Sequence, residues 1–415
     1  MLKKINQKWA SEKNLVLIDQ VVFSGTSFVV TALLARFLPI DLFGAFSSIV
    51  LAVYLVLSVS NAMVIQPMQV AYARFGNAIT YFGFTLFMQL VIALIAASAG
   101  LVLGHLSAHY FQVNYSINWP AVAALVLFWL LHDYFRKTFL AKQAIKKTIV
   151  VDCVLASIQL GGIIGLYLFQ LLTLNAAITI LAAGYAAAFI VAMAISQIPL
   201  STIRYSSTYF TYHKKEGAFL VLSSLLQWWS SNLFVIASGL FLGSAALGAF
   251  RLVQSMFGVL NILLQTYENY VLPKAAKLYA DSLTEAKLFL RLVSKKGAIL
   301  FALVLVPLFL FSKQAILLVG GPQYQDYHFV VKGMVLLYAI IYGGYAVRLP
   351  IRMLALNKAF FIGYCISFAF SAATFHYLLQ NFNLIGAISG LIINQLLMIS
   401  YWHFQLKKSN FTLWK

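Results

Sequence analysis

Long apolar stretches constrain this chain more than any other feature of its sequence. A helix needs roughly 20 apolar residues to cross about 30 Å of hydrocarbon. Twelve stretches reach that length: 15–38, 42–68, 79–104, 119–141, 148–172, 174–199, 217–242, 245–272, 296–319, 328–349, 359–380 and 383–406. The connections between them are short, and 62% of all residues are hydrophobic while 9% are charged. We therefore expect an all-α polytopic membrane protein with no soluble domain.

The formal net charge of +19 first suggests a nucleic-acid partner, but the distribution of the charge argues against one. If the N-terminus is cytoplasmic, 25 of the 29 Lys and Arg residues fall on the cytoplasmic side of the predicted spans. The positive-inside rule explains that bias and places both termini in the cytoplasm. Anionic lipid headgroups are then sufficient partners for these charges, and we predict no nucleic-acid binding.

A short internal repeat indicates that the chain is duplicated. Five residues of the segment 37–46 recur at an offset of 204: Phe37, Leu38, Gly44, Ala45 and Phe46 match Phe241, Leu242, Gly248, Ala249 and Phe250. A second match has an offset of 211: Tyr134, Lys137 and Lys147 correspond to Tyr345, Arg348 and Lys358. We interpret the chain as two six-helix lobes, 1–205 and 206–415, related by an axis along the membrane normal.

The sequence contains no pattern typical of an enzyme. Seven histidines are scattered, the two cysteines are isolated, and no GxxxxGK[ST] phosphate-binding loop is present. No His, Cys and Asp cluster has metal-ligand spacing. We predict a transporter without a cofactor, for which an H⁺ or Na⁺ gradient is the expected driving force.

Polar residues in the eighth predicted span are the candidates for substrate binding. They are spaced by three or four residues and fall on one continuous face along the length of the helix: Arg251, Gln254, Gly258, Asn261, Gln265 and Glu268. Lipid cannot satisfy these groups, so the face meets either a hydrated cavity or another helix. The cavity interpretation predicts that spans 1, 2, 7 and 8 line it.

Few carboxylates lie inside the predicted spans. Asp19 and Glu268 are the candidates for ion coupling, both toward the cytoplasmic end of a span. The alternative to ion coupling for Asp19 is a structural role, in which the dipole at the start of the helix stabilises its carboxylate. We expect Asp133 and Asp152 to form ion pairs with the basic loop that follows the fourth span, since Lys137 is four residues after Asp133.

Four basic residues lie toward the outer ends of spans: Arg36, Arg251, Lys313 and Lys332. Snorkelling to outer headgroups explains the two lysines. Arg251 extends the polar face and Arg36 lies in the repeated motif, so both are candidates for binding an anionic group. Tyr342 belongs to another helical stripe of tyrosines and arginines and is a candidate for stacking on a sugar.

Two segments carry a resemblance to a known family. The run LLARFLPIDLFGAFSSIVLAVYLV (33–56) resembles the first hairpin of polysaccharide transporters, the Wzx-type O-antigen flippases of the multidrug/oligosaccharidyl-lipid/polysaccharide (MOP) superfamily. The segment DYFRKTFLAKQAIKKTIVVDCVLASIQLGGIIG (133–165) looks like the basic inner loop and following helix of the same family. The family usually has Leu-Gly-Pro where this chain has Leu38-Pro39-Ile40.

The resemblance implies a MATE/MOP-like fold and translocation of an undecaprenyl-pyrophosphate-linked oligosaccharide across a bacterial inner membrane. A cationic central lumen, described for relatives, would suit Arg36 and Arg251. Membrane lipids, a polysaccharide polymerase and a chain-length regulator are the implied partners.

Three alternatives remain open. A cation-coupled multidrug exporter would share the fold, but it prefers carboxylates deep in the spans. A lipid II flippase normally has two further spans. A membrane-embedded polymerase or glycosyltransferase would need a large outer loop or clustered acidic residues, and the sequence has neither.

Overall fold

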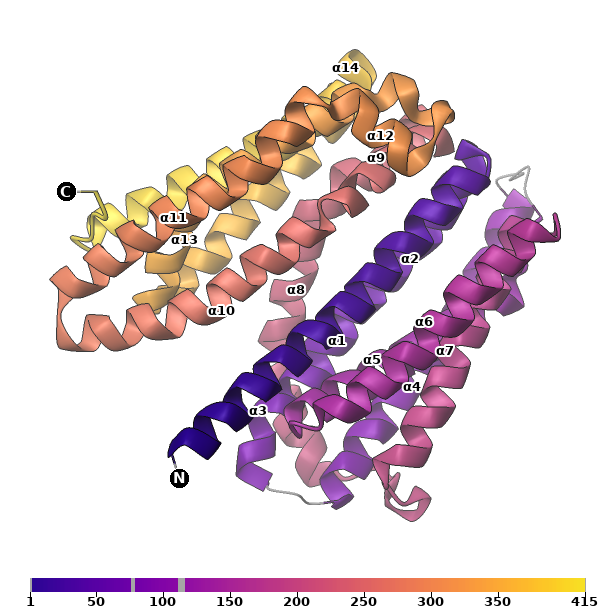
Figure 1. Cartoon of the computed structure of the whole chain (residues 1–415), viewed down its shortest axis with the longest axis horizontal. Helices are drawn as coiled ribbons and strands as arrows, with labels where there is room; N and C mark the ends of the chain where they lie inside the picture. The colour runs from indigo at the N-terminus through magenta and orange to yellow at the C-terminus, as the bar shows by residue number, and fades with distance from the viewer. Residues whose placement is uncertain (1, 76–78, 111–115, 415) are drawn as a thin grey trace. The chain divides into compact units, whose positions relative to one another are not determined.

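The computed structural model describes residues 2–75, 79–110 and 116–414, and within these ranges it consists of helices joined by short turns, without a β-strand (Figure 1). The elements are α1 (Leu2–Phe37), α2 (Ile40–Ser60), the π-helix η1 (Asn61–Ile65), α3 (Gln66–Phe75), α4 (Ile79–Tyr110), α5 (Trp119–Ala141), α6 (Ile145–Leu168), α7 (Leu174–Ser196), the 3-10 helix η2 (Leu200–Thr202), α8 (Ser207–Leu242), α9 (Ser244–Met256), α10 (Gly258–Asp281), α11 (Leu283–Leu310), α12 (Ser312–Gly320), the 3-10 helix η3 (Pro322–Tyr327), α13 (His328–Met353) and α14 (Asn357–Lys408). The prediction of an all-α fold is confirmed.

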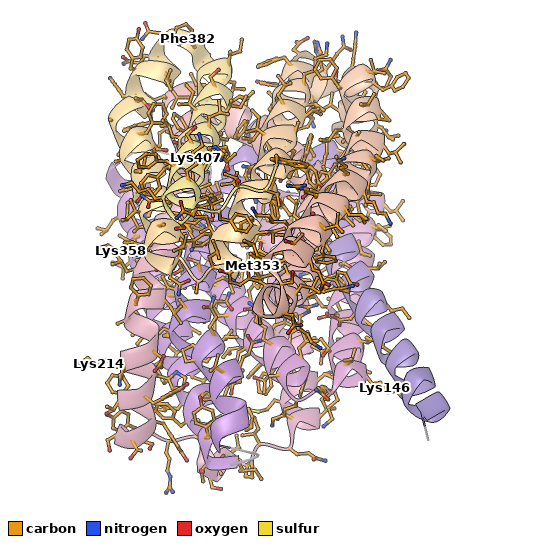
Figure 2. The ribbon with its side chains drawn as sticks, turned by 90° about the vertical axis from the view of Figure 1, so that its left-hand side faces the viewer. Lys146, Lys214, Met353, Lys358, Phe382 and Lys407 are labelled. Atoms are coloured by element: carbon orange, nitrogen blue, oxygen red, sulfur yellow. The ribbon has the colours of Figure 1, made fainter. Side chains whose placement is uncertain are left out.

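Most of these helices are long and apolar enough to span a bilayer. Nine helical segments of the described chain meet that criterion, and ten do if the bent pair α9–α10 is one span. The 52-residue helix α14 contains a break at Asn383, whose φ is 50°, where the predicted span 383–406 begins. In Figure 2, Phe382 and Lys358 mark opposite ends of the part of α14 that precedes the break. The count of twelve spans and the cytoplasmic termini stay predictions.

The helices form two compact units. Unit 1 comprises Met1–Leu38 and Ile49–Leu225, and unit 2 comprises Pro39–Ser48 and Leu226–Lys415. The division therefore falls within α8, about twenty residues after the predicted lobe boundary, and the start of α2 is grouped with unit 2. The assignment of lobes to 1–205 and 206–415 stays a prediction.

In unit 1, α5 packs against α4 and α7, while α6 packs against α1 and α7. Helices α5 and α6 form an antiparallel hairpin closed by a tight turn, where Gln143 adopts a φ of 56°. Large side chains fill the interior, among them Tyr81, Tyr134 and Phe135, all fully buried. The Tyr134 hydroxyl lies 2.8 Å from Thr85 Oγ1, so this buried polar group has a partner.

In unit 2, α13 packs against α14 and α11, and α10 packs against α11 and α13. Trp402 of α14 is buried beside Gly363 and stacks on Phe360, with ring centroids 5.1 Å apart. The sequence pattern of 274–292 predicts one amphipathic helix at the cytoplasmic membrane interface, but the segment consists of the end of α10 and the start of α11. Ser282 has an extended backbone and caps α11 by accepting from the N–H of Glu285, so the single-helix prediction is wrong.

The two copies of the repeated motif meet in unit 2. A Cβ added to Gly44 would overlap the carbonyl oxygen of Ser244, and one added to Gly248 would lie 2.9 Å from the carbonyl oxygen of Ile40. Ile40 and Ser244 are themselves separated by the repeat offset of 204. The contact is therefore reciprocal, as expected where two equivalent segments cross, and it requires glycine at both positions.

Candidate functional site

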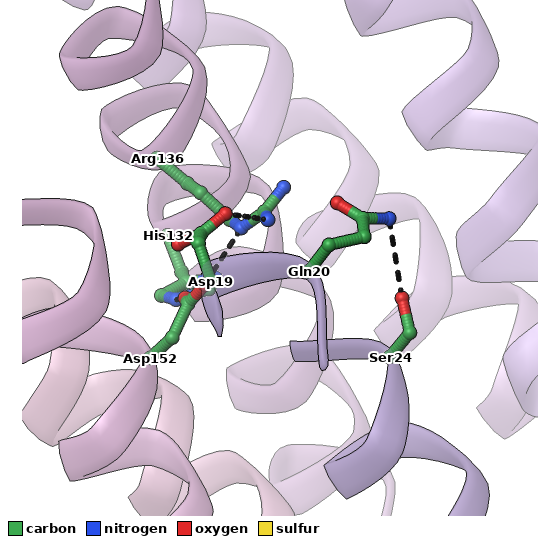
Figure 3. A network of polar contacts seen from close by, with 6 residues as sticks. All are labelled: Asp19, Gln20, Ser24, His132, Arg136 and Asp152. Atoms are coloured by element: carbon green, nitrogen blue, oxygen red, sulfur yellow. Dashed lines mark hydrogen bonds and ion pairs between the residues drawn. The ribbon is translucent and has the colours of Figure 1, made fainter. Parts of the chain in front are cut away.

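A buried charge network in unit 1 joins α1, α5 and α6 (Figure 3). Arg136 lies between two carboxylates: its Nη2 is 2.7 Å from Asp19 Oδ2 and its Nε is 2.8 Å from Asp152 Oδ2. His132, one turn before Arg136 on α5, places Nε2 3.2 Å from Asp152 Oδ1. All four residues are buried. Gln20, next to Asp19 on α1, instead donates to Ser24 at 3.3 Å.

The α5–α6 hairpin explains how these residues meet. The turn between Ala141 and Ile145 reverses the chain, so residues equally far from the turn on either side lie at the same level. Arg136 precedes the turn by about as many residues as Asp152 follows it. Helix α1 packs against α6 and adds Asp19. The network is thus assembled by one local hairpin and one long-range helix contact.

With His132 neutral, the network carries one guanidinium and two carboxylates and therefore a net charge of −1. Two of its buried atoms, Asp19 Oδ1 and His132 Nδ1, have no hydrogen-bond partner in the described part of the chain. The Arg136 guanidinium also lies 4.0 Å from the centroid of the Phe23 ring. Binding of one proton or one monovalent cation would make the network electrically neutral.

A second basic residue of α5 lies beside this network. Lys137 Nζ is 2.9 Å from Asp133 Oδ2, which confirms the predicted i,i+4 ion pair, and it also donates to Asn61 Oδ1 of η1. The expected ion pairing of Asp152 is likewise confirmed, through Arg136. The charge distribution of the sequence places Arg136 among the basic residues on the cytoplasmic side of the spans and does not indicate that it is buried.

In unit 2, Glu268 of α10 is paired with two arginines of α13. Arg348 Nη2 is 3.3 Å from Glu268 Oε2, and Arg352 Nη1 contacts Oε1. The Tyr345 hydroxyl donates to Glu268 Oε2 at 3.4 Å. Glu268 is buried, Arg348 is partly buried, and the Arg352 side chain is 40% exposed. This cluster, Glu268–Arg348–Arg352, carries a net charge of +1.

The predicted polar face of the eighth span is interrupted. Helix α9 ends at Met256, α10 begins at Gly258, and the two axes are bent by 43°. The prediction of one continuous helical face from Arg251 to Glu268 is therefore wrong, because it assumed an unbroken helix. On the first side of the break, Arg251 Nη1 donates to Gln254 Oε1 at 2.8 Å. On the other side, Asn261 and Gln265 are exposed and Glu268 is buried.

Arg36 and Tyr342, the two remaining candidates for substrate binding, lie in different environments. Arg36 is exposed in the last turn of α1. Tyr342 packs against α11: its hydroxyl donates to the Ser294 carbonyl at 2.7 Å, and its ring stacks on Phe301 with centroids 4.4 Å apart. Sugar stacking by Tyr342 and anion binding by Arg36 stay predictions.

Within the described ranges, no group of three His, Cys, Asp or Glu side chains could hold a metal ion. In unit 1, Asp19 and Asp152 pair with a guanidinium and Asp133 pairs with an ammonium group; in unit 2, Glu268 pairs with two guanidiniums. The polar chemistry of both units is therefore that of ion pairs inside an apolar bundle.

No protein-family model matches the sequence, and no curated protein matches it. Solved structures do match. The lipid II flippase MurJ, in an inward closed conformation, aligns with a TM-score of 0.72 at 10% identity, over 96% of this chain and 87% of that one. A multidrug-resistance MATE-family transporter of the MOP superfamily, in an inward-facing conformation, gives 0.66 at 12% identity, over 96% and 95%.

A mutant of the Vibrio cholerae MATE transporter VcmN aligns with a TM-score of 0.62 at 15% identity, over 98% of each chain. At these identities the likeness concerns the fold. Over nearly its whole length, the chain has the all-α fold of MOP-superfamily transporters, as predicted. Together with the apolar spans, this fold indicates a multi-pass membrane protein.

Proposed function

We propose that the chain is a flippase that moves an undecaprenyl-pyrophosphate-linked oligosaccharide across a bacterial inner membrane by alternating access. The oligosaccharide would be the repeat unit of an O-antigen or another surface polysaccharide. In this proposal the chain is a transporter and not an enzyme, and a polymerase and a chain-length regulator would act on its product. The fold supports it, because its structural neighbours include a protein named as a lipid II flippase.

The observation that carries the proposal is the pairing of the deep carboxylates with arginine. Asp19 and Asp152 share Arg136, and Glu268 is bound by two arginines. A carboxylate held by a guanidinium is a poor partner for a cationic drug, because the drug must displace a charge that is already in place. The net charge of +1 on Glu268, Arg348 and Arg352 suits an anionic substrate instead.

Moving a pyrophosphate through hydrocarbon requires groups that balance about two negative charges. In the proposal, Arg36 and Arg251 attract the pyrophosphate near the outer side, since a guanidinium offers a planar fork that matches phosphate oxygens. Gln254 orients the fork of Arg251, to which it is hydrogen-bonded. Asn261, Gln265 and Tyr342 would accept the glycan while the lipid tail stays in the membrane. The alternative is that both arginines snorkel to outer headgroups.

The test replaces Arg251 by Gln and follows lipid-linked oligosaccharide in each leaflet. We expect the substrate to accumulate on the cytoplasmic leaflet at normal protein level, and Arg251→Lys to restore export only partly, because the charge remains and the fork is lost. Lys313→Gln is the matched control, since Lys313 is exposed and its outer position is explained by snorkelling. Wild-type export by an Arg36→Gln, Arg251→Gln double variant would refute the electrostatic role.

The proposed driving force is an ion gradient, with Asp19 and Glu268 as the coupling carboxylates. Asp19 is the stronger candidate, because its network has a net charge of −1 and an unpaired carboxylate oxygen, whereas Glu268 lies in a cluster of net charge +1. Proton or Na⁺ binding would neutralise the Asp19 network at one stage of the cycle. Full transport by an Asp19→Asn, Glu268→Gln double variant would remove both residues from the coupling mechanism.

A cation-coupled multidrug exporter is the second candidate. The similarity to MATE-family structures and the net negative charge of the Asp19 network favour it. Expression of the chain in a drug-sensitive, efflux-deficient host distinguishes the two. Resistance to cationic dyes that depends on Asp19, with normal polysaccharide export, would favour the exporter over the flippase.

A further inference from the structure

The Glu268–Arg348–Arg352 cluster has more positive charge than its own contacts use. One carboxylate faces two guanidiniums placed one turn apart on α13, at i and i+4. Like charges at that spacing repel each other. Because the Arg352 side chain is 40% exposed, its ion pair adds little stability, since exposed pairs contribute about 0–1 kcal/mol. Stability alone therefore gives a weak reason for the second arginine.

One N–H donor of the cluster has no acceptor in the part of the chain that the structure describes. Arg348 Nε is buried and has no hydrogen-bond partner among the residues that the structure describes. An arginine presents five N–H donors, and each of the two arginines makes an ion-pair contact to Glu268 through one of its nitrogens. A buried N–H without an acceptor is costly, so a shift of the partly exposed Arg348 side chain that brought this N–H to an outside acceptor would be stabilising.

Aromatic rings hold the two arginines in place. The Arg348 guanidinium lies 5.3 Å from the Tyr345 ring centroid and 5.5 Å from that of Phe360, and the Arg352 guanidinium lies 5.8 Å from the Phe360 ring. Phe360 is itself fixed by its stacking on Trp402. The forks are therefore oriented before any ligand arrives, which lowers the entropic cost of binding.

The backbone beside the cluster favours an anion as well. Phe360 belongs to the first turn of α14, and the N-terminal end of a helix carries a partial positive charge. The opposite partial charge of the α13 C-terminus is reduced, because the N–H groups of the following turn bond to the carbonyls of Pro350, Ile351 and Arg352.

From these observations we infer that Arg348 and Arg352, positioned by Glu268 and Phe360, form a binding site for a phosphate group. The phosphate belongs either to the headgroup of an anionic lipid or to a pyrophosphate, free or lipid-linked. Glu268 competes with the phosphate for the two forks and sets the affinity. The inference concerns binding alone and does not depend on the proposed flippase activity.

The test titrates the purified full chain in neutral detergent with inorganic pyrophosphate and follows thermal unfolding. A ligand that binds the folded state raises the melting temperature in a saturable way. We expect saturation in the wild type, and a concentration requirement at least about tenfold higher in an Arg348→Gln, Arg352→Gln variant. Glu268→Gln should act in the opposite direction and bind pyrophosphate more tightly, because the cluster then has a net charge of +2.

Lys407→Gln, Lys408→Gln is the matched control: it removes the same two charges from exposed positions at the end of α14 and should respond like the wild type. Potassium chloride at equal ionic strength controls for screening. If the arginine pair variant does not fold, Arg352→Lys replaces it and should bind more weakly, since the charge remains without the fork. No saturable shift in the wild type, or an equal loss in the lysine control, would overturn the inference.

A lipid arm identifies the source of the phosphate. Native mass spectrometry of the wild type released from nanodiscs containing phosphatidylglycerol or phosphatidylcholine reports which lipid stays bound. Retention of phosphatidylglycerol that depends on Arg348 and Arg352, and is displaced by pyrophosphate, identifies a lipid headgroup. Binding of pyrophosphate without such retention identifies a soluble or substrate-borne pyrophosphate. A failed titration contradicts the site and leaves export by the flippase to be judged on its own.

Discussion

Replacing Gly44 by alanine should destabilise unit 2, because the new methyl group meets backbone. The added Cβ would lie 3.0 Å from Ser244 Cα and closer still to the carbonyl oxygen of Ser244. Favourable carbon–carbon contacts begin at about 3.5 Å, so the start of α2 and the start of α9 must separate by more than about 0.5 Å. Backbone cannot rotate out of the way as a flexible side chain can.

The expected cost follows from known effects of overpacking. Inserting a carbon into a close-packed contact costs about 1–3 kcal/mol, and we place Gly44→Ala toward the upper end because the obstacle is backbone. Gly248→Ala should be milder. Its Cβ would lie 2.9 Å from the Ile40 carbonyl oxygen, and alanine recovers about 0.5–1 kcal/mol relative to glycine within a helix.

The assay is thermal unfolding of the purified chain in detergent. For a unit of this size, 1 kcal/mol shifts the melting temperature by about 2–4 °C, so Gly44→Ala should lower it by several degrees. Gly343→Ala is the control on α13: its Cβ meets no atom within 4 Å, so helix propensity should raise the melting temperature slightly. The close-approach argument is refuted if Gly44→Ala and Gly343→Ala give the same melting temperature, or if Gly44→Ala is the more stable.

Other predictions concern buried and interfacial charges. Arg136→Gln removes the only guanidinium that the described network offers its two carboxylates and should cost about 3–5 kcal/mol, seen as a large fall in melting temperature; an unchanged value would contradict the pairing. Burial, followed by Lys147, lowers the pKa of Lys142, so its charged form is disfavoured in the folded chain. Lys142→Met should therefore stabilise the chain at pH 7, by an amount that shrinks as the pH approaches 10.5. A stabilisation that increases with pH would contradict the cost of burying the charged lysine. Reporter fusions after residues 116 and 208 should lie on opposite sides of the membrane, and the same side for both would contradict the topology.

The apolar pattern of the sequence predicted much of the helix inventory, because hydrocarbon thickness sets the length of a span. It did not predict the break at Phe257, because the apolar period continues through that residue and the interruption depends on tertiary packing. The end of α10 could have been predicted. Ser282 and Glu285 have the spacing of a capping box, and Ser282 does cap α11.

For the charge clusters, individual residue roles were harder to infer than the presence of charge. Arg136 was counted with the cytoplasmic cations, although the hairpin geometry of 136 and 152 predicts its contact with Asp152. The contact with Asp19 depends on α1 packing against α6, which no local pattern encodes. Glu268 and its arginines are 80 or more residues apart in sequence, and only the packing of α10 on α13 brings them together.

The second repeat offset, 211, relates the contacts of Lys137 in unit 1 to those of Arg348 in unit 2. Lys137 and Arg348 are separated by 211 residues, and each lies on the first helix of a helical hairpin, α5–α6 or α13–α14. Lys137 bonds to Asn61, and Arg348 bonds to Glu268. At the first offset of 204, Asn61 corresponds to position 265, one turn before Glu268. A basic residue at equivalent positions therefore reaches a polar side chain on equivalent helices, with an amide as the partner in unit 1 and a carboxylate in unit 2.

The two contacts differ in how their charge is balanced. Since an amide does not compensate the charge of Lys137, Asp133 completes the pairing in unit 1, whereas Glu268 pairs with two arginines in unit 2. The duplication thus keeps the contact and changes its partner: Lys137 in unit 1 is balanced by Asp133, whereas the cluster in unit 2 has one carboxylate for two arginines and a net charge of +1.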